Sequence, residues 1–233
     1  IIAGINAAHS VKREVPLVLS RGEAFIGVMI DDLVTKGVTE PYRMLPSRAE
    51  YRITLREGNA DLRLSKIGHQ IGLLPDERYE KALTRAQAIE RLLDELKSRR
   101  IGPQDPLNRV LISRGTTPLT ENGSSLYDLL RRPSVRLSDL LPRDGIPEDV
   151  RSEAEIEAKY AGYLAQQERE IARLKRLEKL IIPVELDYNL LSNLSIEGRD
   201  RLARVRPSTF GQASRIPGIS HADLSMLAIT LRR

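Results

Sequence analysis

Arginine side chains are the residues of this chain best suited to chemistry, and they gather in one segment. Residues 40–64 contain five of them: Arg43, Arg48, Arg52, Arg56 and Arg63. A guanidinium group stays charged and donates two parallel hydrogen bonds, which suits it to phosphate. The three arginines at four-residue steps share one face of a helix or of a strand. The spacing predicts either a phosphate-binding row or a solvated face that pairs with nearby acids, namely Glu50, Glu57 and Asp61.

The conformation that would carry this row is open. Ser47 and Glu50 have the spacing of a capping box, which favours a helix from Arg48 to Gly58. Polar and apolar residues alternate from 48 to 56, which favours a strand. Both readings place the arginines opposite an apolar row made of Ala49, Tyr51, Ile53 and Leu55.

Composition predicts a mainly α-helical globular protein. The 233 residues are 41% hydrophobic and 30% charged, which suits a chain with a real core. Aromatic residues make up only 4%, and the abundant Leu, Arg, Glu and Ala are good helix formers. The net charge of +5 permits a nucleic-acid partner without requiring one.

Several kinds of site are excluded or disfavoured. The chain has no cysteine, so it has no disulfide, no cysteine-ligated zinc and no thiol nucleophile. The histidines His9, His69 and His221 lack metal-ligand spacing, and no metal site is expected. Asp31 and Asp32 are adjacent and should diverge on a helix, which argues against a paired-carboxylate site. No apolar run approaches the ~20 residues that span a membrane.

Apolar periodicity and capping residues predict helices along most of the chain. The expected ranges are 1–10, 22–36, 65–72, 76–100, 106–113, 125–131, 134–141, 148–180, 195–205, 207–214 and 222–231. The longest would extend roughly 50 Å at 1.5 Å per residue, along a bundle or as an arm. The picture is a multi-helix, bundle-like protein.

The C-terminal region 186–231 suggests a binding surface. Its turn Ile216–Ile219 reads I-P-G-I between helices, which is typical of a helix-hairpin-helix phosphate site or of an ordinary αα-corner. Its apolar residues should partly stay exposed, because small units bury less of their surface, unless they pack on the long helix 148–180. These residues are Leu190, Leu191, Leu194, Ile196, Leu202, Phe210, Ile216, Ile219, Leu224, Leu227 and Leu231.

Five stretches resemble those of a known family and occur in the same order. Segment 40–64 reads E-P-Y-R-M-L-P-S-R-A-E-Y-R-I-T-L-R-E-G-N-A-D-L-R-L and resembles the signature segment of the GidA/MnmG family. That family comprises flavin-dependent enzymes that build the carboxymethylaminomethyl group on the wobble uridine of tRNA. Four further stretches are similar to it: A-G-I-N-A-A at 3–8, G-E-A-F-I-G-V-M-I-D-D-L-V-T-K-G at 22–37, L-D-Y-N-L-L-S-N-L-S at 186–195, and R-P-S-T-F-G-Q-A-S-R-I-P-G-I-S at 206–220.

The resemblance implies an organisation in three parts. The chain begins without Met inside a small-residue helix, so we interpret it as a C-terminal fragment. Residues 1–21 would be the last helix and exit of an α/β FAD-binding domain. Residues 22–145 would form a helical linker domain with the tRNA-facing arginines. Residues 146–233 would form a C-terminal helical domain with the long helix and a partner-binding subdomain.

The resemblance also implies roles for individual residues. Cofactor-binding residues would be Gly4 and Asn6. The tRNA-binding set would be Arg43, Arg48, Arg52, Arg56, Asn59 and Arg63. The partner-binding set would be Arg206, Phe210, Gln212, Arg215, Ile216, Gly218 and Leu224. No catalytic residue is expected within this chain.

The implied cofactors and partners belong to the longer protein. They are FAD, with NAD used by the flavoprotein, tRNA, and the GTPase MnmE, in a cytoplasmic homodimer without a membrane. Most of the FAD site would lie outside these residues, so activity of this chain alone is not expected. The alternative function is a stand-alone helical nucleic-acid-binding module that uses the Ile216–Ile219 turn.

Overall fold

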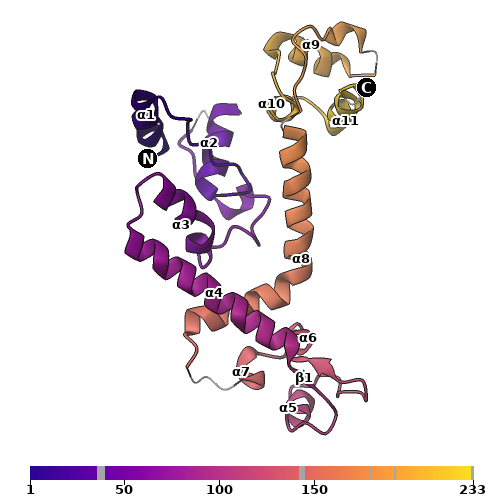
Figure 1. The fold of residues 1–233 in the computed structure, drawn as a ribbon. Helices are drawn as coiled ribbons and strands as arrows, with labels where there is room; N and C mark the ends of the chain where they lie inside the picture. The colour runs from indigo at the N-terminus through magenta and orange to yellow at the C-terminus, as the bar shows by residue number, and fades with distance from the viewer. Residues whose placement is uncertain (36–39, 142–144, 179, 192, 232–233) are drawn as a thin grey trace. The chain divides into compact units, whose positions relative to one another are not determined.

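The computed structural model describes residues 1–35, 40–141, 145–178, 180–191 and 193–231. The chain forms two compact units, each made of two stretches: unit 1 comprises 1–18 and 51–165, and unit 2 comprises 19–50 and 166–233. Both are built mainly from helices (Figure 1), which confirms the predicted α class. The α/β remnant at the N-terminus stays a prediction.

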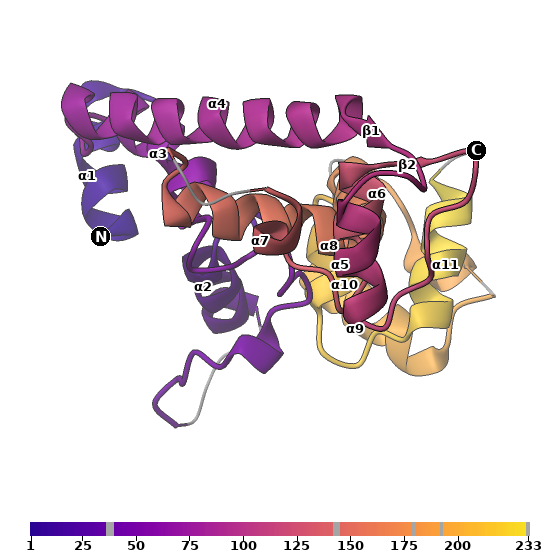
Figure 2. The same ribbon diagram turned by 90° about the horizontal axis from the view of Figure 1, so that it is seen from below.

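Unit 1 is organised around one long helix and a cluster of short ones. Its elements are α1 (Ile2–Lys12), α3 (Ala60–Gln70), α4 (Asp76–Ser98), β1 (Arg100–Ile101), α5 (Leu107–Ser113), β2 (Ser124–Ser125), α6 (Leu126–Leu130), α7 (Leu137–Leu140) and the first part of α8 (Glu148–Glu178). Helix α3 lies along α4, and α6 packs near the far end of α4 (Figures 1 and 2). The core between them contains Leu96, Leu111, Leu126 and Leu129, all fully buried.

Unit 2 has a separate core. Its elements are α2 (Phe25–Thr35), η1 (Pro46–Arg48), the last part of α8, η2 (Tyr188–Leu190), α9 (Ile196–Val205), α10 (Phe210–Arg215) and α11 (His221–Thr230). The C-terminal helices α9, α10 and α11 are drawn in yellow tones in Figure 1. Their core contains Leu202, Phe210, Ala213 and Leu227. Ser195, Thr209 and Ser220 start α9, α10 and α11 by accepting a hydrogen bond from a backbone N–H of the first turn.

Most of the predicted helices are confirmed within a few residues, and the exceptions have local causes. Helix α3 begins at Ala60 instead of 65, after Asn59, whose side-chain amide donates to the Thr54 carbonyl. Helix α10 begins at Phe210 instead of 207, because Thr209 caps it. The strands β1 and β2 were not predicted, since two residues are too few for a period to appear. The predicted end of the second helix, at residue 36, lies outside the described residues.

The arginine segment is neither of the two predicted elements. After the three-residue η1, residues 50–54 form turns, and no capping box at Ser47 starts a helix. The apolar side of the alternation is confirmed in part: Ala49, Tyr51 and Leu55 are buried, and Ile53 is half-buried. These side chains anchor an irregular segment by burial, without a backbone ladder.

A single buried carboxylate joins two helix N-termini in unit 2. Asp223 on α11 accepts hydrogen bonds from the backbone N–H and hydroxyl of Ser195 (2.7 and 3.0 Å) and from those of Ser220 (3.0 and 2.5 Å). Burial raises the pKa of Asp223, but the hydrogen bonds from Ser220 and Ser195 together outweigh it and the net pKa is lowered. The charged carboxylate therefore fixes the start of α9 against the start of α11.

We call the arrangement of Asp223 with Ser195 and Ser220 the clip. It predicts that position 198, a glycine, tolerates no side chain. A Cβ at Gly198 would lie 2.8 Å from Asp223 Cγ and 2.9 Å from Ser195 Oγ, so Gly198→Ala must push the clip apart. We expect the free energy of unfolding to fall by about 1–3 kcal/mol in urea titrations. The matched control is Gly162→Ala on α8, where nothing lies within 4 Å and a gain of up to about 1 kcal/mol is expected. Equal effects of the two substitutions would contradict the clip.

Candidate nucleic-acid interface

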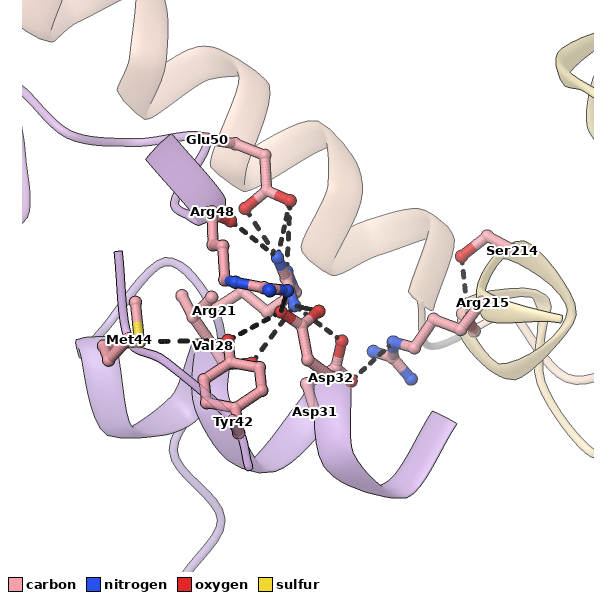
Figure 3. A network of polar contacts seen from close by, with 11 residues as sticks. Arg21, Val28, Asp31, Asp32, Tyr42, Met44, Arg48, Glu50, Ser214 and Arg215 are labelled. Carbon is pink, nitrogen blue, oxygen red and sulfur yellow. Dashed lines mark hydrogen bonds and ion pairs between the residues drawn. The ribbon is translucent and has the colours of Figure 1, made fainter. Parts of the chain in front are cut away.

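The most developed polar cluster of unit 2 centres on Asp32 of α2, which is only 2% exposed. Its Oδ1 accepts from Arg21 Nη1 at 2.8 Å, and its Oδ2 accepts from the Tyr42 hydroxyl at 2.8 Å (Figure 3). Arg21 also donates to both oxygens of Glu50 and to the carbonyls of Val28 and Arg48. Since buried charges require partners, these contacts satisfy the Asp32 carboxylate, and Arg21 also holds the backbone of Arg48 in place.

The same Arg21 guanidinium also binds Asp31, at 3.1 Å from Nη1 to Oδ2. The two adjacent aspartates are thus connected through one arginine, which is long enough to reach both. Burial lowers the pKa of Arg21, but its bonds to Glu50 and Asp32 outweigh this and raise it. Both carboxylates serve as anion partners of Arg21, which leaves no role for them as an acid–base pair.

Arg48 lies on the outer side of this cluster. Its guanidinium carbon is 4.7 Å from the centre of the Tyr42 ring, within the range of a cation–π contact. Its Nη1 is 3.9 Å from Asp32 Oδ2, and 43% of its side chain is exposed. Arg48 is therefore a surface cation whose planar guanidinium packs on the Tyr42 ring (Figure 3).

The C-terminal bundle contributes one residue to the cluster. Arg215 of α10 donates from Nε to Asp31 Oδ1 at 2.9 Å (Figure 3). The cluster thus contains three arginines, Arg21, Arg48 and Arg215, opposite three carboxylates of Asp31, Asp32 and Glu50.

The other predicted tRNA-binding residues fall into two groups. Arg43 of unit 2 and Arg52 of unit 1 are exposed. Arg56, Asn59 and Arg63 of unit 1 are brought together: Arg63 donates to Asn59 Oδ1 at 3.0 Å and to the Arg56 carbonyl at 3.2 Å. Burial and then the neighbouring Arg56 lower the pKa of Arg63.

Arg56 itself faces inward. Its guanidinium binds the Glu153 carboxylate, on α8, and the carbonyl of Ile53. Glu153 is only 3% exposed, so this is a buried ion pair. A neighbouring pair strengthens the attachment, since Arg85 of α4 binds Asp61 at 2.8 Å and the Gly58 carbonyl at 3.1 Å. These contacts hold the segment onto α4 and α8.

The residues predicted to bind a cofactor do not form a cradle in this structure. A Cβ at Gly4 would meet nothing within 4 Å. The Asn6 side chain accepts from the Leu17 N–H at 2.7 Å and donates to the Leu17 carbonyl at 3.0 Å, which folds the following loop back onto α1. The described residues around α1 therefore do not fit FAD by themselves, and the role of Gly4 and Asn6 stays a prediction.

The predicted partner-binding residues divide by exposure. Phe210 is buried in the core, while Ile216 and Leu224 are half-buried against it. Arg206 and Gln212 are exposed; the Gln212 side-chain oxygen accepts from the Ser208 N–H at 2.7 Å. Large apolar side chains that remain exposed in this bundle were only partly anticipated: Ile181, Val184, Leu190, Ile196, Val205 and Ile229.

Two side chains of α9 lie beside Gly218 in the Ile216–Ile219 turn. A Cβ at Gly218, whose φ is +87°, would lie 2.5 Å from Arg201 Nε and 2.6 Å from Glu197 Oε1. Glu197 and Arg201 pair with each other at 2.9 Å, and the Ile219 N–H donates to the Ile216 carbonyl. A carboxylate beside the turn and an amide already in use disfavour phosphate binding there, and favour the ordinary αα-corner.

Sequence reasoning missed Arg21, Asp32 and Tyr42. No local sequence pattern marks them, because Arg21 lies in a connector, Asp32 on a helix and Tyr42 in a loop. The available signal was Asp32 itself, a charge on the apolar side of a helix that also contains Val28. Among the described residues, no group of acids and histidines could hold a metal ion, and no helix is long and apolar enough to cross a membrane.

Two family models match the chain. Residues 76–168 match "tRNA modifying enzyme MnmG/GidA C-terminal helical domain", and residues 170–233 match "tRNA modifying enzyme MnmG/GidA C-terminal helical bundle". The two matches adjoin within α8 and together cover more than half of the chain.

Curated relatives and solved structures agree with these models. The chain is 49% identical over its whole length to the tRNA uridine 5-carboxymethylaminomethyl modification enzyme MnmG of Caldicellulosiruptor saccharolyticus, and 46% identical to that of Syntrophotalea carbinolica. It spans 38% of the length of each. The form II crystal structure of Aquifex aeolicus GidA superposes with a TM-score of 0.75 at 38% identity, over 99% of this chain and 36% of that one.

The buried ion pair predicts that Arg56 is required for folding before it can matter for any ligand. Arg56→Ala leaves the Glu153 carboxylate buried without its partner, so the free energy of unfolding should fall by about 3–5 kcal/mol. The control is Arg204→Ala, which removes an exposed pair with Asp200 and should cost about 0.3–0.5 kcal/mol. Chemical denaturation of both variants decides; a loss below about 1 kcal/mol for Arg56→Ala would contradict a buried pair.

Proposed function

Because the chain belongs to the MnmG/GidA family of tRNA-modifying enzymes and comprises its C-terminal helical domains, we propose that it binds tRNA during modification of the wobble uridine. The observation that supports this most is the set of exposed arginines along the segment 43–52, with Arg48 held in a defined orientation. Cations that contact phosphates position an RNA without reading its sequence.

Only part of the predicted arginine row is suited to this role. Arg43, Arg48 and Arg52 are exposed, so their guanidinium groups can approach a phosphate. Arg56 and Arg63 are engaged with protein groups, so they support the segment instead. The proposed contacts are therefore Arg43 and Arg48 in unit 2 and, separately, Arg52 in unit 1, where Arg56, Asn59 and Arg63 hold the segment that follows it.

This proposal assigns the catalytic reaction to parts of the longer protein outside these residues. The described site has cations, structural carboxylates and one tyrosine, and it has no nucleophile–base pair in contact. FAD and NAD would act elsewhere in the enzyme, in a cytoplasmic homodimer. This chain would hold the RNA in place.

Salt-dependent binding of an unmodified tRNA transcript tests the proposal. Each of Arg43→Ala, Arg48→Ala and Arg52→Ala removes about one phosphate contact, which should lower the slope of log K against log salt by about 0.7–0.9. Arg91→Ala is the matched control, an exposed arginine on α4 whose loss changes the net charge equally. Slopes that equal that of the control in all three variants would contradict the proposal.

A partner-binding role has its own support. Leu190 and Ile196 are 79% and 82% exposed, and they belong to η2 and α9, which contact each other. Ile196 begins α9, which also contains Arg199, Arg201 and Arg204. Exposed apolar groups together with arginine are typical of protein interfaces. We propose that this face of the bundle binds the GTPase MnmE.

The partner proposal predicts a selective loss. Ile196→Glu places a charge in the apolar face without touching the core, so capture of MnmE should fall at least about tenfold while tRNA affinity is unchanged. Leu73→Glu is the control, since Leu73 is 60% exposed in unit 1. If Ile196→Glu captures MnmE as well as wild type does, the partner surface lies elsewhere. Phe210 is not substituted, because it belongs to the core.

A further inference from the structure

We propose that Tyr42 and Asp32 are positioning residues that hold the Arg48 guanidinium in the orientation in which it contacts an RNA phosphate. The proposal rests on the proposed tRNA-binding function and goes beyond it, because it assigns the orientation of one contact to two residues that do not touch the RNA.

The first step is the burial of Asp32. At 2% exposure its carboxylate has no room to rotate away, and both of its oxygens are engaged: Oδ1 by Arg21 at 2.8 Å and Oδ2 by the Tyr42 hydroxyl at 2.8 Å. A buried charge is costly unless its partners stay in place. Asp32 is thus a fixed point on α2.

The second step is the orientation of Tyr42. Its hydroxyl is tied to the fixed carboxylate, which holds the outer end of the ring in place, while one face of the ring is in contact with Arg48. Burial and then the hydrogen bond to Asp32 raise the pKa of the Tyr42 hydroxyl, so it stays protonated and remains a donor. The ring face therefore has a defined direction before any ligand arrives.

The third step is Arg48. Its guanidinium carbon lies 4.7 Å from the Tyr42 ring centre, and its Nη1 lies 3.9 Å from Asp32 Oδ2. A planar cation that is stacked on a ring and attracted by a carboxylate loses fewer conformations on binding. Since 43% of its side chain is still exposed, Arg48 remains accessible on its outer side.

The neighbouring exposed arginines lack such support in the described contacts. The two cation–π contacts found among the described residues involve Arg48 and Lys97, and neither involves Arg43 or Arg52. Arg48 is consequently the residue whose contribution should depend on another side chain.

The test measures the affinity of the full chain for an unmodified tRNA transcript in a double-mutant cycle. Tyr42→Leu should weaken binding about two- to fivefold, which corresponds to an exposed cation–π contact. In the Arg48→Ala background, Tyr42→Leu should have no further effect, because its only route to the RNA is gone. Tyr163→Leu, which removes an exposed tyrosine of α8, should leave affinity unchanged.

Two conservative variants separate the roles. Tyr42→Phe keeps the ring and loses the bond to Asp32, so its affinity should lie between those of wild type and Tyr42→Leu. Arg48→Lys keeps the charge and loses the planar group, so it should show most of the loss of Arg48→Ala. The second variant leaves Tyr42 and Asp32 intact, and it decides the question if Tyr42→Leu does not fold.

A spectroscopic readout needs no RNA. The Arg48 Nε proton should be shifted upfield by the Tyr42 ring in wild type, and the shift should vanish in Tyr42→Leu. The proposal is overturned if the two substitutions are additive, if Arg48→Lys binds like wild type, or if the shift is absent. Tyr42→Phe equal to wild type overturns the role of Asp32. If Arg48→Ala does not change tRNA affinity, the proposed tRNA contact of Arg48 fails as well. This outcome distinguishes failure of the tRNA contact from failure of the positioning role alone.

Discussion

The buried charge of Asp32 is the constraint on which the arrangement of the candidate interface depends. A carboxylate at 2% exposure is stable only while Arg21 and Tyr42 stay bonded to it. Arg21 in turn binds the backbone carbonyl of Arg48, at the end of η1, and the carboxylate of Glu50. One electrostatic requirement on α2 therefore fixes Arg21 in the connector before that helix, and Tyr42 and the end of η1 after it.

The arginines of this chain have two different roles, and the burial of the side chain distinguishes one role from the other. Arg56 and Arg85 attach the segment 51–61 to α8 and α4 through Glu153 and Asp61. Arg43 and Arg52 point their charge outward. A count of positive charge treats all of these alike, so a phosphate-binding role can be assigned only once each guanidinium has been followed to its partner.

The sequence predicts what depends on neighbours along the chain. The helices α9 and α11 start where Ser195 and Ser220 stand, because each serine caps a backbone N–H three residues later. The long helix α8 and the mainly helical class follow from the same local signals. The GidA/MnmG resemblance was visible for the same reason, since the motifs are contiguous.

Contacts between distant positions were out of reach. Arg56 meets Glu153, which is 97 positions away, and this pairing turns the predicted helix or strand at 48–56 into an irregular anchored segment. Asp223 reaches Ser195 across 28 positions, so two serine caps that look independent share one carboxylate. The site residues that were missed, Arg21, Asp32 and Tyr42, acquire their meaning only from such long-range geometry.

The interleaving of the two units has a consequence for synthesis on the ribosome. Residues 19–50 belong to unit 2, but the rest of that unit starts at residue 166. Unit 1 can close once residue 165 has emerged, with 19–50 looped out from between its two stretches. During that interval the acids of α2 have Arg21 but still lack Arg215, which emerges only with the second stretch of unit 2. The polar cluster around α2 can therefore be completed only after unit 1 has been synthesised.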